Sequence, residues 1–328
     1  MAGAEQIGLF GMVSFTTEKI WEYERIVTCP SVQIVLLHLM RIPIPLRTLL
    51  VLTLLCSTAG SFAQVLPNYV LFDAKGKKLS YTRALGMVER GDIILFGELH
   101  NNSIAHWLQL ELAKHLADKG PLLMGAEMIE ADDQATLDRY LRGEIDQAAL
   151  DTLARLWKSH PTDYAPLVDL AKARGLPFIA CNVPRRYARA VSKGGFEALD
   201  TVPANERAWI APLPIAFDPS LPGYVKMLAM MGDHASPTMT MAQALKDATM
   251  AHFIATNTKE GARFLHFNGS YHSDFREGIG WYLQRLRPDL KRVTIATVTQ
   301  SQLNKLDAEH LAKADIILCV DEDVPGSY

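Results

Sequence analysis

Residues 91–102 read GDIILFGELHNN, an apolar run that ends abruptly in polar side chains. The run Ile93–Phe96 contains only Ile, Leu and Phe, so it predicts a strand that is buried on both faces. Glu98 and His100 follow, two residues apart in extended backbone, and therefore share a face. Polar side chains at the carboxyl end of a buried strand are typical of the ligand site of a parallel α/β sheet.

Similar apolar runs follow along the chain, and stretches with the 3.6-residue period of helices separate them. The predicted strands are Ile93–Phe96, Leu122–Ala126, Pro177–Cys181, Phe264–Phe267, Val293–Val298 and Ile316–Val320. The predicted helices are Ser103–Ala117, Asp132–Leu141, Gln147–Lys158, Tyr164–Ala173, Thr240–Thr256 and Asp274–Arg285. This alternation predicts an α/β fold whose mostly parallel sheet is flanked by helices on both faces. Residues 184–238 are rich in proline and predict a helical insertion.

The N-terminal part of the chain differs in composition from the rest. Residues 46–60 concentrate leucine in a run too short to span a bilayer comfortably. A short basic lead precedes this run, and Ser61-Phe62-Ala63 follows it as a small-x-small cleavage pattern. This order predicts a secretory signal peptide at 40–63, preceded by a spurious leader at 1–39 and followed by one α/β domain at 64–328.

An exported protein of the periplasm or the cell envelope is therefore expected. Lipid attachment at Cys56 would make it a membrane-associated lipoprotein, but Leu55 stands where lipid attachment requires a small residue.

The composition of the chain excludes several classes of protein. Hydrophobic residues make up 49% and charged residues 21%, which excludes a disordered or fibrous chain. A net charge of -3 without a Lys/Arg-rich run gives no sign of the basic surface that nucleic-acid-binding proteins carry.

Polar side chains follow several of the predicted strands, and two of the turns share the spacing G-x-x-H. Glycine lets the backbone turn sharply off a strand, so the histidine three residues later is placed over the sheet edge. The residues predicted to converge there are Glu98, His100, Glu127 and His272. Such a set would hold a divalent metal, or act as acid and base in the hydrolysis of an ester or peptide bond.

Glu127 also has a structural interpretation. It comes directly after a strand that is otherwise apolar, and a buried carboxylate needs a partner. Arg185 or Arg186, after the next strand, would provide that partner as an ion pair across the sheet edge.

Several of these motifs together resemble the ChaN-like family of haem-binding bacterial lipoproteins. The motifs, in chain order over roughly residues 90–285, are the stretch 91–100, Gly125–Met128, Trp157 with Tyr164–Pro166, Leu176–Arg185 and Gly269–His272. The family is related to the erythromycin esterases and to the Tiki/TraB proteins, in which G-x-x-H motifs and glutamates line a catalytic or metal site.

The resemblance implies an exported haem-binding protein that serves iron acquisition as a homodimer, together with outer-membrane haem-uptake components. It implies a tyrosine oxygen on the iron, which suits ferric haem. Tyr164 is the first choice because it lies in a shared motif, Tyr140 is the second, and His100 or His272 would support that ligand. The alternative function is a metal-dependent or Glu/His-dependent hydrolase of the same superfamily, because a tyrosine-ligated carrier does not need the glutamates and histidines.

Overall fold

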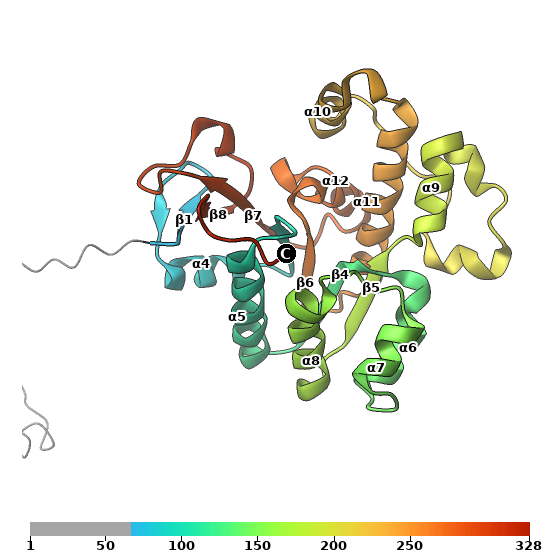
Figure 1. Cartoon of the computed structure of the whole chain (residues 1–328), viewed down its shortest axis with the longest axis horizontal. Coiled ribbons are helices and arrows are strands. Elements are labelled where there is room, and N and C mark those ends of the chain that lie inside the picture. Colours follow the sequence, from blue (N-terminus) through green and yellow to red (C-terminus); the bar gives the residue numbers. More distant parts are fainter. Residues whose placement is uncertain (1–66) are drawn as a thin grey trace, which may run out of the picture. The chain divides into compact units, whose positions relative to one another are not determined.

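The computed structural model describes residues 67–328, which form one compact unit. The signal peptide and the leader predicted for residues 1–63 lie outside the described residues. The centre of the fold is an eight-stranded sheet in the order β2-β1-β8-β7-β3-β6-β4-β5 (Figure 1). Its strands are β1 (Tyr69–Asp73), β2 (Lys78–Leu79), β3 (Ile93–Glu98), β4 (Leu122–Glu130), β5 (Phe178–Asn182), β6 (Arg263–Gly269), β7 (Arg292–Gln300) and β8 (Ile316–Asp321).

The sheet is mostly parallel, as predicted. All neighbouring strands from β8 to β5 pair in parallel, and only β1 pairs antiparallel, with β2 and with β8. The six strands predicted from apolar runs are all present. The sequence prediction missed the two strands of the antiparallel edge: β1, although its residues 69–72 form an apolar run, and β2, which has only two residues.

Helices cover both faces of the sheet, which confirms the predicted fold class. They are α4 (Tyr81–Val88), α5 (Ser103–Lys119), α6 (Gln134–Leu141), α7 (Gln147–Leu153), α8 (Ala165–Arg174), α9 (Arg185–Gly194), α10 (Pro222–Met231), α11 (Pro237–Asn257) and α12 (Ile279–Leu286). Ile94 and Phe96 of β3 pack in the core beneath α4, α5 and α8, whereas Ile93 and Leu95 pack beneath α9, α11 and α12 (Figure 1). Alternate residues of one strand thus serve two cores, as the unbroken apolar run implies.

Two helices differ most from their predicted bounds, each for a local reason. The helix predicted to reach Lys158 ends at Leu153, because Ala154 is extended and the Arg155 N–H bonds to the Asp133 carboxylate instead of continuing the helix. The helix predicted from Asp274 begins at Ile279. Phe275 before it has a φ of 56°, a left-handed conformation that interrupts an α-helix.

Residues 184–238, predicted as a helical insertion, form α9, short 3₁₀ helices at Phe196–Leu199 and Ala204–Trp209, and α10. α9 packs along α11 on one face of the sheet, while α10 lies farther from the sheet (Figure 1). Within residues 67–328, none of the helices is both long enough and apolar enough to cross a membrane.

Candidate functional site

The carboxyl ends of three adjacent strands bring the four predicted Glu and His residues together. β6 lies between β3 and β4 in the sheet, so the turns after these strands are neighbours. Glu98 ends β3, Glu127 lies in β4, and His272 lies in the 3₁₀ turn after β6. The residues form two Glu–His pairs, one made by Glu98 with His100 and the other by Glu127 with His272.

The first pair is built around a fully buried carboxylate. Glu98 is 1% exposed, and its Oε1 accepts hydrogen bonds from His100 Nδ1 at 2.9 Å and from the Tyr164 hydroxyl at 2.6 Å. Its Oε2 accepts a bond from Gln109 Nε2 of α5 at 2.6 Å. Three donors thus satisfy the buried carboxylate, and Glu98 fixes His100 in the tautomer whose Nε2 is free to accept a proton or bind a ligand.

The second pair extends into a buried three-residue cluster. His272 Nε2 lies 3.1 Å from Glu127 Oε1, and its Nδ1 lies 2.5 Å from Asp247 Oδ1 of α11. The other Glu127 oxygen accepts the Gly269 N–H at 2.8 Å. All three titratable side chains are buried, so the imidazolium of His272 holds two carboxylates that are shielded from water.

The pKa shifts of this cluster follow from its geometry. Burial alone would lower the pKa of His272, but the Glu127 and Asp247 carboxylates outweigh it and raise that pKa to about 10. Burial opposes ionisation of Glu127, yet His272 holds the pKa of Glu127 well below its usual range. For Asp247 burial prevails over His272, and the pKa of Asp247 is raised. His272 and Glu127 are therefore a charged pair at neutral pH.

His100 is the titratable residue of the site that is open to solvent. Its side chain is 36% exposed, and within residues 67–328 its Nε2 makes no hydrogen bond. Burial would lower the pKa of His100, but its hydrogen bond to Glu98 and the nearby Glu127 carboxylate raise it. The ring packs edge-on against Trp157, with centroids 4.9 Å apart. Glu98 thus orients the His100 ring through Nδ1, while part of the ring stays open to solvent.

The two G-x-x-H turns interlock, which gives their shared spacing a physical reason. A Cβ at Gly269 would lie 2.8 Å from His100 Nε2, so the second glycine leaves space for the first histidine. A Cβ at Gly97 would lie 2.9 Å from Ser273 Oγ and 3.0 Å from Ser270 Cα, so the first glycine leaves space for the second turn. Each glycine therefore allows close approach of the other turn.

Gly269→Ala should displace His100 and destabilise the fold by about 1–3 kcal/mol, because the new methyl group overlaps the imidazole in a packed site. Urea unfolding measures the loss. Gly86→Ala is the matched control: it lies within α4 with open space around its Cβ position, and should stabilise the chain by about 0.5–1 kcal/mol. Equal stability of the two variants would show that the turns do not interlock in solution.

The two tyrosines that the resemblance suggested as iron ligands are both buried. Tyr164 is 2% exposed and donates its hydroxyl to Glu98, and burial followed by the Glu98 charge raises its pKa. Tyr140 donates to Asp169 at 2.5 Å, and burial and Asp169 raise its pKa as well. Both phenols are held protonated in this conformation. Their role as iron ligands stays a prediction that requires these hydrogen bonds to break.

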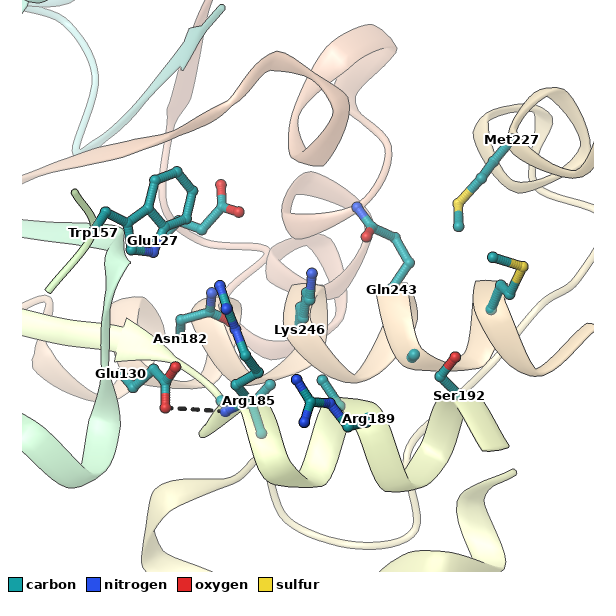
Figure 2. A pocket seen from close by; sticks show the side chains of 14 residues that line it. Glu127, Glu130, Trp157, Asn182, Arg185, Arg189, Ser192, Met227, Gln243 and Lys246 are labelled. Carbon is teal, nitrogen blue, oxygen red and sulfur yellow. Dashed lines mark hydrogen bonds between the residues drawn. The ribbon is translucent and has the colours of Figure 1, made fainter. Parts of the chain in front are cut away.

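Two pockets open beside the Glu/His cluster. The smaller, about 320 Å³, is lined by Glu127, Trp157, Asn182 and side chains of α9 and α11 (Figure 2). The larger, about 940 Å³, is lined by Trp157, the segment around it, and Tyr328. Glu130, Trp157 and Arg185 border both pockets, so the two form adjoining parts of one site.

Several residues of the site were not predicted from the sequence. Asp247 and Gln109 sit within helices whose apolar pattern gives no sign of the buried groups that they contact. The proposed structural partner of Glu127 was also different: Arg186 pairs with Asp132 and Glu206, and Glu127 pairs with His272. Within the described chain no group of three or more His, Cys, Asp or Glu is arranged to hold a metal ion, so the metal-site alternative stays a prediction.

The family model for haem-binding uptake proteins of the Tiki superfamily, ChaN, matches residues 84–283, which is more than half of the chain. The chain belongs to this family. The fold agrees with that of ChaN of Campylobacter jejuni, a structure described as showing cofacial heme binding, with a TM-score of 0.58 and 19% identity over 76% of this chain and 96% of that one.

Two more distant solved structures have lower similarity to this ChaN-family chain. A succinoglycan biosynthesis protein has a TM-score of 0.45 and 13% identity over 79% of this chain and 95% of that one. An erythromycin esterase in its open conformation has a TM-score of 0.43 and 11% identity over 76% of this chain and 97% of that one. No curated protein matches the sequence significantly.

Proposed function

We propose that this protein binds haem as its cargo in the site formed by the two adjoining pockets. Its membership of the ChaN family carries the proposal. The larger pocket, at about 940 Å³, has the size of sites that enclose large organic ligands, and Trp157 provides an aromatic wall for a flat macrocycle. The pockets lie at the carboxyl edge of the parallel strands, where ligands bind in open α/β sheets.

His100 is the best placed of the predicted residues to bind the iron. Its Nε2 is free within residues 67–328, and its Nδ1 is held by the Glu98 carboxylate, an arrangement that commonly orients imidazole ligands of metals. Its ring contacts Trp157, which borders both pockets. Tyr328, 72% exposed and lining the larger pocket, offers a phenol that is open to a ligand, unlike Tyr164.

We further propose that the protein is exported, acts as a homodimer, and serves iron acquisition at the cell envelope with outer-membrane haem-uptake components. The signal-like sequence at 40–63 supports export. The family's role in haem uptake supports the iron-acquisition part of the proposal.

The haem content of protein purified from a haem-supplemented culture tests the function. The wild type should carry haem with a Soret band distinct from that of free haemin. His100→Ala should shift this band or lose the haem, whereas His115→Ala, a half-buried histidine of α5 that contacts Glu89, should match the wild type. Haem-free wild-type protein would contradict haem binding. A His100→Ala spectrum identical to that of the wild type would show that His100 is not an iron ligand.

A hydrolase remains a second candidate because one observation favours it. His100 combines a raised pKa, an oriented Nδ1 and an Nε2 that makes no hydrogen bond within residues 67–328, as a general base requires. The wild type should then hydrolyse members of an ester or peptide library, and His100→Asn should abolish that turnover while leaving the fold intact. Haem-loaded protein without turnover of any library member would contradict this second candidate.

A further inference from the structure

Three cations line the smaller pocket. Arg185 and Arg189 come from α9, and Lys246 comes from α11 (Figure 2). Among residues 67–328 none of these three side chains takes part in an ion pair or hydrogen bond. Two acids also line the pocket. Glu127 pairs with His272, and Glu130 accepts from the Arg185 backbone N–H and from Arg155, a cation that it shares with Asp132 and Asp133. The lining of the pocket therefore holds one more cation than acid, and neither acid forms an ion pair with any of the three cations.

The position of these cations is unfavourable for the helix that carries them. Arg185 is the first residue of α9, where the helix dipole disfavours positive charge. Arg189 lies four residues later on the same side of the helix and repels it. Charges kept against local stability are typical of binding sites, where they are compensated only when a ligand is present.

The neighbouring Arg186 shows that α9 has acidic partners within reach. Arg186 Nη1 and Nη2 pair with Asp132 and Glu206, each at 2.6 Å, and its guanidinium lies over the Tyr187 ring. That arginine does not line the pocket, and it pairs with two acids. The guanidinium groups of Arg185 and Arg189, which line the pocket, form no ion pair with any acid of residues 67–328. Arg186 thus has a structural role, whereas the other two arginines are available to a ligand.

We propose that Arg185, Arg189 and Lys246 bind an oxyanion group, a carboxylate or phosphate, of the ligand that lies against Trp157. Arginine and lysine are the side chains that bind such groups through charge-assisted hydrogen bonds. In Figure 2 Arg185 and Lys246 lie between Trp157 and Arg189. A ligand whose flat part lies against Trp157 would therefore place an anionic group next to these cations. The expected source is the carboxylate pair of the porphyrin, and in this respect the inference rests on the proposed haem function.

Four probes test the anion site on the full chain. Haemin and haemin dimethyl ester, which lacks free carboxylates, are titrated by Soret absorbance, and citrate and pyrophosphate are titrated by calorimetry. The wild type should bind haemin about tenfold more tightly than the ester, because the ester loses charge-assisted bonds. Arg189→Gln and Lys246→Gln should each remove most of that preference. Lys193→Gln is the matched control, since Lys193 is exposed on α9 outside the pocket.

The stability of Arg189→Gln separates loss of a ligand contact from loss of the fold. Its midpoint of thermal unfolding should equal or exceed that of the wild type, because the substitution removes a repulsion within α9. A preference for haemin that survives in both pocket variants would overturn the inference, as would equal binding of haemin and ester with no binding of citrate or pyrophosphate. Wild-type protein that binds citrate or pyrophosphate through Arg189 but no haemin would uphold the anion site and overturn the haem function.

Discussion

His272→Ala should lower the free energy of unfolding by about 3–5 kcal/mol at pH 7, because it removes the cation that holds two buried carboxylates. Glu127 and Asp247 would then lie on either side of a cavity with no counter-charge. Urea unfolding followed by circular dichroism measures the loss. His115→Ala, which breaks a histidine–carboxylate contact near the surface, is the matched control and should cost far less.

The cluster of Glu127, His272 and Asp247 should also determine how the stability of the protein depends on pH. The pKa of His272 is raised from 6.5 to about 10 in the folded state, so folding takes up a proton between these values. The stabilisation is fully present below pH 6.5 and is lost as the pH rises through 10, with an upper limit of ~5 kcal/mol at about 1.4 kcal/mol per pKa unit.

His272→Ala should move this pH dependence to a lower range of pH. Without the imidazolium, protonation of Asp247 or Glu127 relieves the buried charge, so the variant should gain stability as the pH falls from 7 towards 5. A wild type whose unfolding free energy stays flat from pH 6.5 to 10 would contradict the charged state assigned to His272.

Glu98→Ala should also cost about 3–5 kcal/mol, because two buried donors and one partly buried donor lose their acceptor at once. His100 Nδ1, the Tyr164 hydroxyl and Gln109 Nε2 would each be left unsatisfied. The same substitution should release the orientation of His100 and weaken whatever its Nε2 binds. Chemical unfolding gives the first effect and haemin titration gives the second.

Glu89→Ala provides the comparison for Glu98. Glu89 also accepts a bond from a histidine, at 2.7 Å from His115 Nε2, but it lies at the surface, where water replaces a lost partner. Its loss should leave both stability and haem affinity close to those of the wild type. A Glu98→Ala variant that unfolds at the same urea concentration as Glu89→Ala would show that the three bonds do not act in solution.

The sequence predicted the parallel sheet well because its strands are buried on both faces and carry unbroken apolar runs. Ile93–Phe96 is such a run. β1 carries a comparable run at residues 69–72 but pairs antiparallel at the sheet edge, outside the alternation of strands and helices from which the sheet was predicted. The convergence of Glu98, Glu127 and His272 was also predictable, because the carboxyl ends of adjacent parallel strands meet at one edge.

Other parts of the site depend on contacts between segments that are far apart in the chain. The pattern of apolar and polar residues within one segment does not predict such contacts. Asp247 is one carboxylate in a long helix, and only the packing of α11 against the turn after β6 places it on His272. The hydroxyl of Tyr164 points to Glu98, 66 residues away in the chain, and not to an open pocket. A shared motif locates such residues along the chain but does not determine the direction of their side chains.

Titration of the purified full chain with haemin tests the central claim most directly. Haem binding in the adjoining pockets predicts a saturable Soret shift that ends near one haem per chain at micromolar protein, with a weaker and shifted response in His100→Ala. A wild-type spectrum that remains that of free haemin throughout the titration would contradict the account.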